Sequence, residues 1–157
     1  MMETTASMDS LIHSHPFFQG LNPDQVDLIS SCASFSTFQA GESIFHEGAD
    51  AQKCYLILEG HVSLEIFNLE KGSIPVQTLG PGEVIGWSWL VAPYKWRFDG
   101  RAQEHTTTIS LDGQRLRDLC ESSPLLGYEL LKRFAVIMEQ RLHSTRRQLL
   151  ENYNFRG

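Results

Sequence analysis

Residues 33–111 form a series of short apolar runs separated by glycine-containing turns. Runs of this length at close spacing are typical of antiparallel strands and leave no room for alternating strand–helix units. The pattern therefore predicts a mainly β fold, an antiparallel β-roll of the jelly-roll or double-stranded β-helix type with flanking helices. The predicted strands are Ser34–Phe38, Glu42–His46, Cys54–Glu59, His61–Asn68, Ile74–Leu79, Val84–Ile85 and Thr106–Leu111.

The segments on either side of the roll have helical signals. Asn22, Pro23 and Asp24 supply a polar cap, a first-turn proline and an acid at the positive end of a helix dipole. We predict one domain over 1–157, with an N-terminal helical segment (1–32), the roll (33–113) and C-terminal helices (114–153). The last region divides into a short helix, Gln114–Glu121, and a long helix from about Pro124 to about Tyr153.

The long helix contains apolar positions spaced by four and three residues in alternation, which is the spacing of a coiled-coil seam. The seam residues are Leu131, Ala135, Met138, Leu142, Thr145 and Leu149. A second stripe beside them, suited to face the roll, contains Leu126, Leu130, Phe134 and Ile137. Two stripes favour a homodimer through this helix, and the alternative is one wide core face on a monomer.

Composition excludes several classes of protein. A net charge of −6 disfavours broad nucleic-acid binding, which needs clustered Lys and Arg. No run approaches the ~20 apolar residues of a membrane span. The three cysteines are not clustered, so we predict a reduced, cytoplasmic protein without a metal or a cofactor. His13 and His15 lie in the N-terminal segment, where we expect solvated side chains.

Three segments resemble the strand and turn motifs of the cyclic-nucleotide-binding superfamily. They are Gly41-Glu42-Ser43-Ile44-Phe45-His46-Glu47-Gly48-Ala49-Asp50, Tyr55-Leu56-Ile57-Leu58-Glu59-Gly60-His61-Val62 and Leu79-Gly80-Pro81-Gly82-Glu83-Val84-Ile85-Gly86. The resemblance covers roughly residues 17–150. The superfamily includes catabolite-activator-type regulators, kinase regulatory subunits and gated channels. It implies a β-roll followed by a dimerisation helix. In the regulators a helix-turn-helix domain follows that helix, and since the sequence ends at Gly157 we expect no direct DNA binding by this chain.

The resemblance also implies a phosphate-binding cassette after the turn at 80–82. In the family, backbone N–H groups and an arginine neutralise the cyclic phosphate, and a glutamate accepts a bond from the ribose hydroxyl. Here the cassette begins Gly86-Trp87-Ser88-Trp89, so Trp87 replaces the glutamate. An indole accepts no hydrogen bond, and this departure argues against cyclic nucleotides as the ligand.

The family arginine has two registers in this sequence. Counting back from the strand at 106–111 places Glu104 at that position, whereas a longer insertion places Arg101 and Ala102 there. Arg97 is a further candidate. We predict a ligand site of Gly86, Trp87, Ser88, Trp89, Arg101 and Ala102. The alternative is that the tryptophans only fill the emptied pocket.

These observations predict a non-enzymatic sensing or signalling module that acts as a homodimer, binds a small molecule and passes its state to a separate output protein. The alternative is a ligand-free dimerisation or protein-interaction module. A metal enzyme of the related β-helix type would need two histidines and a carboxylate close together on strands. No such HxH or HxD/E pair falls within a predicted strand, and no local motif suggests catalytic residues.

Overall fold

The computed structural model describes the backbone of residues 7–156 and the side chains of residues 7–152. The chain divides into two compact units, Met1–Leu119 and Cys120–Gly157. The first unit contains the strands and the N-terminal helices, and the second contains the long helix. One helix, α3 (Gly113–Ser122), includes the boundary between the units.

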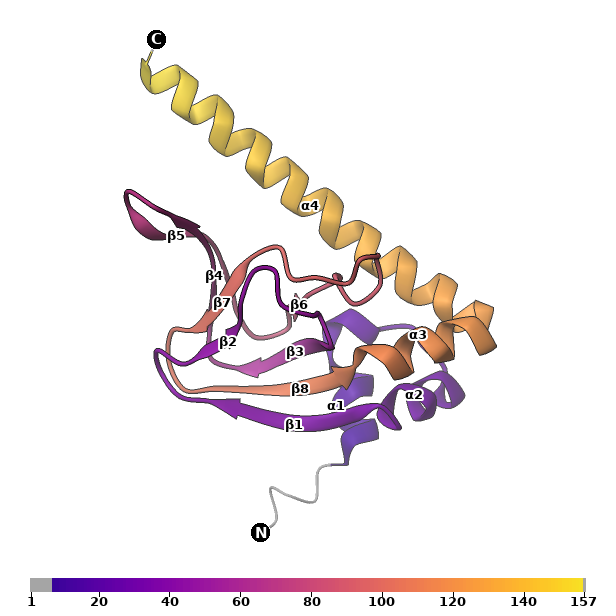
Figure 1. Ribbon diagram of the computed structural model, residues 1–157. Coiled ribbons are helices and arrows are strands. Elements are labelled where there is room, and N and C mark those ends of the chain that lie inside the picture. The colour runs from indigo at the N-terminus through magenta and orange to yellow at the C-terminus, as the bar shows by residue number, and fades with distance from the viewer. Residues whose placement is uncertain (1–6, 157) are drawn as a thin grey trace. The chain divides into compact units, whose positions relative to one another are not determined.

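The strands of the first unit form two four-stranded antiparallel sheets (Figure 1). One sheet has the order β1-β8-β3-β6 and the other β2-β7-β4-β5. The mainly β fold with flanking helices and a long C-terminal helix is confirmed. The strands are β1 (Ala33–Phe38), β2 (Ser43–Phe45), β3 (Lys53–Glu59), β4 (Val62–Asn68), β5 (Gly72–Leu79), β6 (Val84–Ile85), β7 (Asp99–Ala102) and β8 (Thr106–Asp112).

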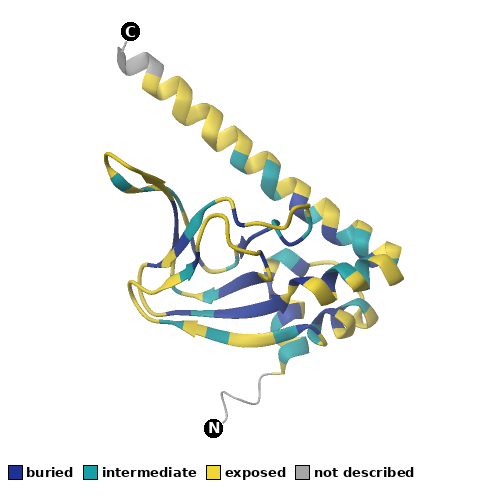
Figure 2. Ribbon diagram, in the orientation of Figure 1, coloured by how far each residue is buried: buried dark blue, intermediate teal, exposed yellow. Residues whose placement is uncertain are grey.

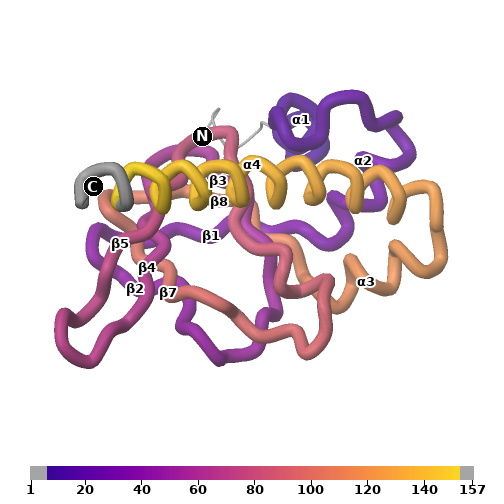
Figure 3. The backbone as a smooth tube through the Cα atoms, turned by 90° about the horizontal axis from the view of Figure 1, so that it is seen from above, coloured from indigo at the N-terminus to yellow at the C-terminus, as the bar shows by residue number. Residues whose placement is uncertain are grey.

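Successive side chains of the central strands point to opposite faces of their sheets, which divides the apolar side chains between two layers. Tyr55 and Ile57 of β3 point into the roll, where they join a buried cluster with Val62 and Leu64 of β4. Figure 2 shows the burial concentrated along β3 and β8. At the other extreme, the β4–β5 hairpin extends away from the rest of the roll (Figures 1 and 3), and Leu69 near its tip is 92% exposed.

Strand β7 is the strand that the sequence does not predict. Its four residues, Asp99–Ala102, lack an apolar alternation, and we interpreted the last two as part of the cassette. β7 pairs with both β2 and β4. Gly100 allows this arrangement, because a Cβ atom there would lie 2.5 Å from Cζ of Phe45. The strand therefore depends on a close backbone–ring contact rather than on its own side chains.

The N-terminal helices are α1 (Met8–Ser14), the 3₁₀ turn η2 (Pro16–Phe18) and α2 (Pro23–Ser30). α2 begins with the predicted cap, a reciprocal box between Asn22 and Gln25. His13 is exposed, but the expectation of a solvated His15 is wrong, since His15 is only 4% exposed. Its Nε2 lies 3.3 Å from the carbonyl oxygen of Ile57, and its Nδ1 accepts a hydrogen bond from the backbone N–H of Phe17.

These contacts require neutral His15, and burial lowers its pKa below the usual 6.5. The unfolded chain therefore binds this proton first as the pH falls. We expect the free energy of unfolding to decrease below pH 6.5, by at most about 1.4 kcal/mol per pH unit from this residue. Urea denaturation between pH 7.5 and 5 measures this slope. His15→Gln should flatten it, His13→Gln should not, and an equal slope in all three proteins would contradict the prediction.

The second unit is dominated by the 33-residue helix α4 (Pro124–Arg156). Its two stripes differ in burial. Leu126, Leu130 and Phe134 are at most 2% exposed, whereas the seam residues Leu131 and Leu142 are 51% and 70% exposed. None of the helices in the described part of the chain is long and apolar enough to cross a membrane.

Candidate functional site

The segment predicted to begin the cassette follows directly after β6. Gly86 has φ +97°, a conformation that favours glycine, and it turns the chain out of the strand. Trp89 then folds back, fully buried, and its indole N–H donates a 3.1 Å bond to the carbonyl oxygen of Gly86. Trp87 and Ser88 are half-buried. The Trp89 indole thus closes the turn Gly86–Trp89 through the carbonyl oxygen of Gly86.

The ring of Trp96 lies against Gly86. A Cβ atom at Gly86 would lie 2.7 Å from Cη2 and Cζ3 of Trp96, so only glycine permits this contact. The same ring stacks on Phe45 with centroids 3.7 Å apart and planes inclined by 10°, and Tyr55 lies nearly parallel to it at 6.5 Å. Trp96 is 6% exposed. An indole therefore occupies the inside of the roll beside the glycine where the family cassette begins.

Backbone hydrogen bonds hold Trp96 in this position. Its N–H donates to the carbonyl oxygen of Ala49, and its carbonyl oxygen accepts from the N–H of Gly48. Asp50 and Lys95 form an isolated bridge beside these bonds and also a side-chain ion pair. The loop before β3 thus anchors the insertion that carries Trp96.

The structure places Arg101 away from the Gly86–Trp89 turn, contrary to the predicted ligand site that included it. Arg101 pairs with Ser63 of β4, whereas Val62 and Leu64 of that strand belong to the core. Because neighbouring residues of a strand face opposite sides, Arg101 lies on the outer face of its sheet. There its Nε donates to Glu65 at 3.4 Å and its Nη1 to the carbonyl oxygen of Gly41.

The other candidates for the family arginine are also outside the core. Glu104 is exposed, and its Oε2 lies 2.5 Å from Nδ1 of His61. Arg97 is exposed directly after Trp96. Ala102 is buried in β7 beside Val62. Of the predicted site residues, the structure therefore brings together Gly86, Trp87, Ser88 and Trp89, and it adds Trp96.

Arg117 of α3 contacts the site, and the sequence analysis did not identify it. Its Nη1 donates to the carbonyl oxygen of Trp89, and its guanidinium lies 4.2 Å from the ring centroid of Tyr94. Cation–π contacts of this kind contribute about 0.5–1 kcal/mol at exposed sites. No local motif marks such a contact, since Arg117 follows Trp89 by 28 residues. Arg117 thereby links the turn and the insertion loop to α3.

The described residues contain no group of three or more His, Cys, Asp and Glu side chains placed to hold a metal ion. Cys54 is buried, and desolvation raises the pKa of its thiol far above the usual value. Burial also raises the pKa of Cys32. Both thiols stay protonated at neutral pH, so neither has the thiolate that nucleophilic catalysis requires.

Comparison with known proteins identifies a shared family. The sequence pattern of the family described as "Cyclic nucleotide-binding domain" matches residues 35–123, more than half of the 157-residue chain. The cyclic AMP receptor protein of Thermus thermophilus is 30% identical over 127 residues, which are 81% of this chain. The chain covers 57% of that relative's length.

Solved structures agree with the fold. The catabolite activator protein of Thermus thermophilus superposes with a TM-score of 0.67 at 30% identity, over 85% of this chain and 61% of that one. A cyclic nucleotide-binding domain from Methylobacillus flagellatus gives a TM-score of 0.76 at 20% identity, over 96% and 83% of the two chains. The latter likeness supports the fold alone.

Proposed function

The chain belongs to the cyclic nucleotide-binding domain family, and on this premise we propose that it is a non-enzymatic signalling module in which cyclic nucleotide binding is altered or lost. The observation that carries the proposal is the position of Trp96, whose ring lies against Gly86 and stacks on Phe45. A bound nucleotide would need the space beside that glycine. It would also need an acceptor for the ribose hydroxyl, which Trp87 cannot supply.

The electrostatics of the roll support the same conclusion. Arg101 is paired with Glu65 on the outer face of its sheet, so it does not offset the charge of a phosphate inside the roll. A buried polar group without a partner costs about 1–3 kcal/mol, and a charged one costs more. A cyclic phosphate in the closed roll would meet aromatic rings instead of a cation.

Isothermal titration calorimetry with cyclic AMP and cyclic GMP tests the proposal. We expect no saturable heat with either nucleotide at concentrations up to about 1 mM, which corresponds to a binding free energy weaker than about 4 kcal/mol. Thermal denaturation with the same nucleotides should show an unchanged midpoint, because a ligand stabilises only the state that it binds. Saturable micromolar binding of either nucleotide by the unmodified chain would overturn the proposal.

The proposed module acts as a homodimer through α4. The predicted seam residues Leu131, Leu142 and Leu149 are more than half exposed on the single chain, although a four–three apolar repeat needs a partner helix to be buried. A second copy of the same helix would cover them. The separate output protein and the cytoplasmic location inferred from the scattered cysteines remain parts of this proposal.

Light scattering after size exclusion tests the dimer. We expect a mass of twice 17.8 kDa for the unmodified chain and of 17.8 kDa after Leu142→Lys, which introduces a charge at the centre of the seam. Val136→Lys is the matched control, because Val136 is 53% exposed on the opposite side of the helix from the seam. A dimer that survives Leu142→Lys would place the contact elsewhere.

A second candidate function is a ligand-free interaction module. The filled space beside Gly86 favours it, and so does the exposed apolar tip of the β4–β5 hairpin, where Phe67 and Leu69 are 58% and 92% exposed. A thermal-shift screen with small aromatic acids and nucleotides separates the candidates. A sensor should be stabilised by a member of the screen, whereas the ligand-free module should respond to none.

A further inference from the structure

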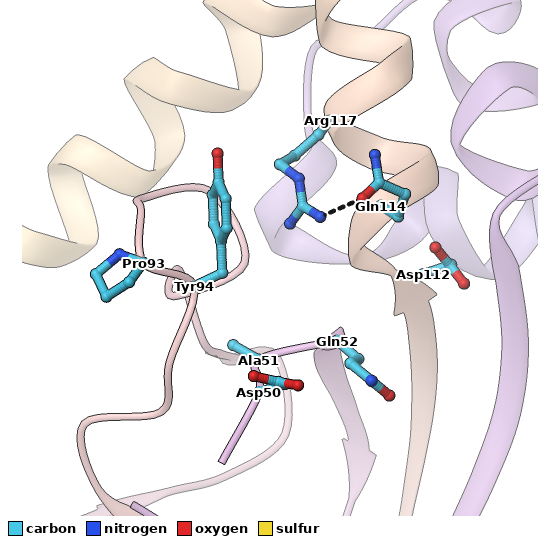
Figure 4. Close-up of a pocket in the computed structure, with 8 residues that line it drawn as sticks. All are labelled: Asp50, Ala51, Gln52, Pro93, Tyr94, Asp112, Gln114 and Arg117. Carbon is cyan, nitrogen blue, oxygen red and sulfur yellow. Dashed lines mark hydrogen bonds between the residues drawn. The ribbon is translucent and has the colours of Figure 1, made fainter. Parts of the chain in front are cut away.

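A polar pocket of about 380 Å³ lies on the outside of the first unit, apart from the Gly86–Trp96 contact. Three segments that are distant in the sequence form it: residues 50–52 before β3, residues 93–94 of the insertion loop, and residues 112–117 at the start of α3 (Figure 4). Its volume is at the lower end of the range for small-molecule sites, which suits a ligand of metabolite size.

One side of the pocket presents an oriented cation. Figure 4 shows the Arg117 guanidinium beside the Tyr94 ring, with a 2.6 Å hydrogen bond to Oε1 of Gln114. Together with the bond to Trp89, these contacts fix the plane of the guanidinium and use two of its five N–H groups. Tyr94 reaches this position with φ +58°, and it is the one described non-glycine residue with a positive φ. Such a conformation costs about 1–3 kcal/mol and is concentrated at ligand sites.

Carboxylates line another part of the pocket. Asp50 shares one oxygen with Lys95, and Asp112 uses Oδ1 to accept the backbone N–H of Arg115. Figure 4 shows Asp50 below the Arg117–Tyr94 pair and Asp112 to the right of it, beyond Gln114. A purely anionic ligand would meet these two acids, and a purely cationic one would meet Arg117. A molecule that carries both charges would complement both parts of the lining.

We propose that this pocket binds a small zwitterion of the α-amino acid class, with its carboxylate on Arg117 and its ammonium group near Asp50 and Asp112. The planar guanidinium suits two-point recognition of a carboxylate. Because Arg117 also holds the carbonyl oxygen of Trp89, the ligand would stabilise the Gly86–Trp89 turn from outside the roll. This site does not depend on the contents of the roll, so the cyclic nucleotide titrations and the test below can fail independently.

Thermal denaturation of the full chain with each of the twenty standard L-amino acids tests the proposal, followed by calorimetry of those that respond. We expect at least one to raise the midpoint by a few degrees in a dose-dependent manner. Its N-acetyl derivative and its decarboxylated amine, each of which lacks one charge, should bind at least tenfold more weakly. An unchanged midpoint with all twenty, or a single-charge analogue that binds as tightly as the parent amino acid, would overturn the proposal.

Two substitutions then test the predicted contacts of the ligand's carboxylate and of its ammonium group. Arg117→Gln and Asp50→Asn should each weaken binding at least tenfold, whereas Arg115→Gln, on the same helix but outside the pocket lining, should not. If Arg117→Gln perturbs the fold by losing its bond to Trp89, Asp50→Asn and the analogue series still decide the result. If Asp50→Asn binds the amino acid with unaltered affinity, and the unmodified chain binds the N-acetyl derivative as tightly as the amino acid, a zwitterion site is excluded.

Discussion

Trp89→Ala should lower the free energy of unfolding by about 3–5 kcal/mol, the usual result of deleting a fully buried aromatic side chain. The Trp89 side chain is 0% exposed, and its indole N–H satisfies the carbonyl oxygen of Gly86. A Cβ atom at Gly113 would lie 2.9 Å from Cβ of Trp89, so the start of α3 packs directly on this side chain. Since domains of this size are stable by about 5–15 kcal/mol, this loss is a large fraction of the total.

Chemical denaturation of Trp89→Ala and Trp87→Ala compares the free energy of unfolding that each variant loses. From the sequence alone, the two tryptophans are not distinguished. Trp87 is only half-buried, so its removal should cost less than half as much. Far-ultraviolet circular dichroism controls for folding at the start of each titration. Equal losses for the two variants would mean that Trp89 is not the structural centre of the turn.

The roll was predictable because its signals are local. The seven predicted strands and the flanking helices depend on short apolar runs, turn glycines and caps, which act over a few residues. The α2 cap at Asn22 and the strand Val84–Ile85 lie where the sequence indicates. β7 and buried His15 were not predictable, because each is determined by a distant partner: Phe45 for Gly100 and Ile57 for His15.

The candidate site is harder to predict from the sequence, because it also depends on contacts between distant residues. Gly86, Trp87, Ser88 and Trp89 are adjacent in the chain, and the family motif aligns them directly. The insertion that follows shifts the register by a length that no local pattern fixes. After this insertion, the Trp96 ring contacts Gly86, and Arg101 pairs with Glu65 on the outer face of its sheet. Both depend on strand pairing across the roll.

The double variant Trp87→Glu, Trp96→Arg should bind cyclic AMP, which we expect the unmodified chain not to do. The Trp96 ring contacts Gly86, so an arginine at this position would lie beside the first residue of the cassette. Phe45 and Tyr55 can stack on its guanidinium, as they now stack on the indole. The glutamate supplies the acceptor for the ribose hydroxyl. We expect a dissociation constant on the order of 10–100 μM, or about 6 kcal/mol of binding free energy.

Calorimetry with cyclic AMP compares the double variant with a second one, Trp87→Glu, Trp96→Ala. The comparison separates the effect of the added positive charge from the effect of removing the ring. Both variants remove the indole, but only the first adds a cation, so the alanine version should bind at least tenfold more weakly. Equal affinities would show that the ring excludes the nucleotide by volume alone. A folded double variant that gives no heat would mean that the Trp96 position is not where the phosphate charge must be met. The proposed loss of cyclic nucleotide binding would then have to arise from the turn at Gly86–Trp89, which neither substitution opens.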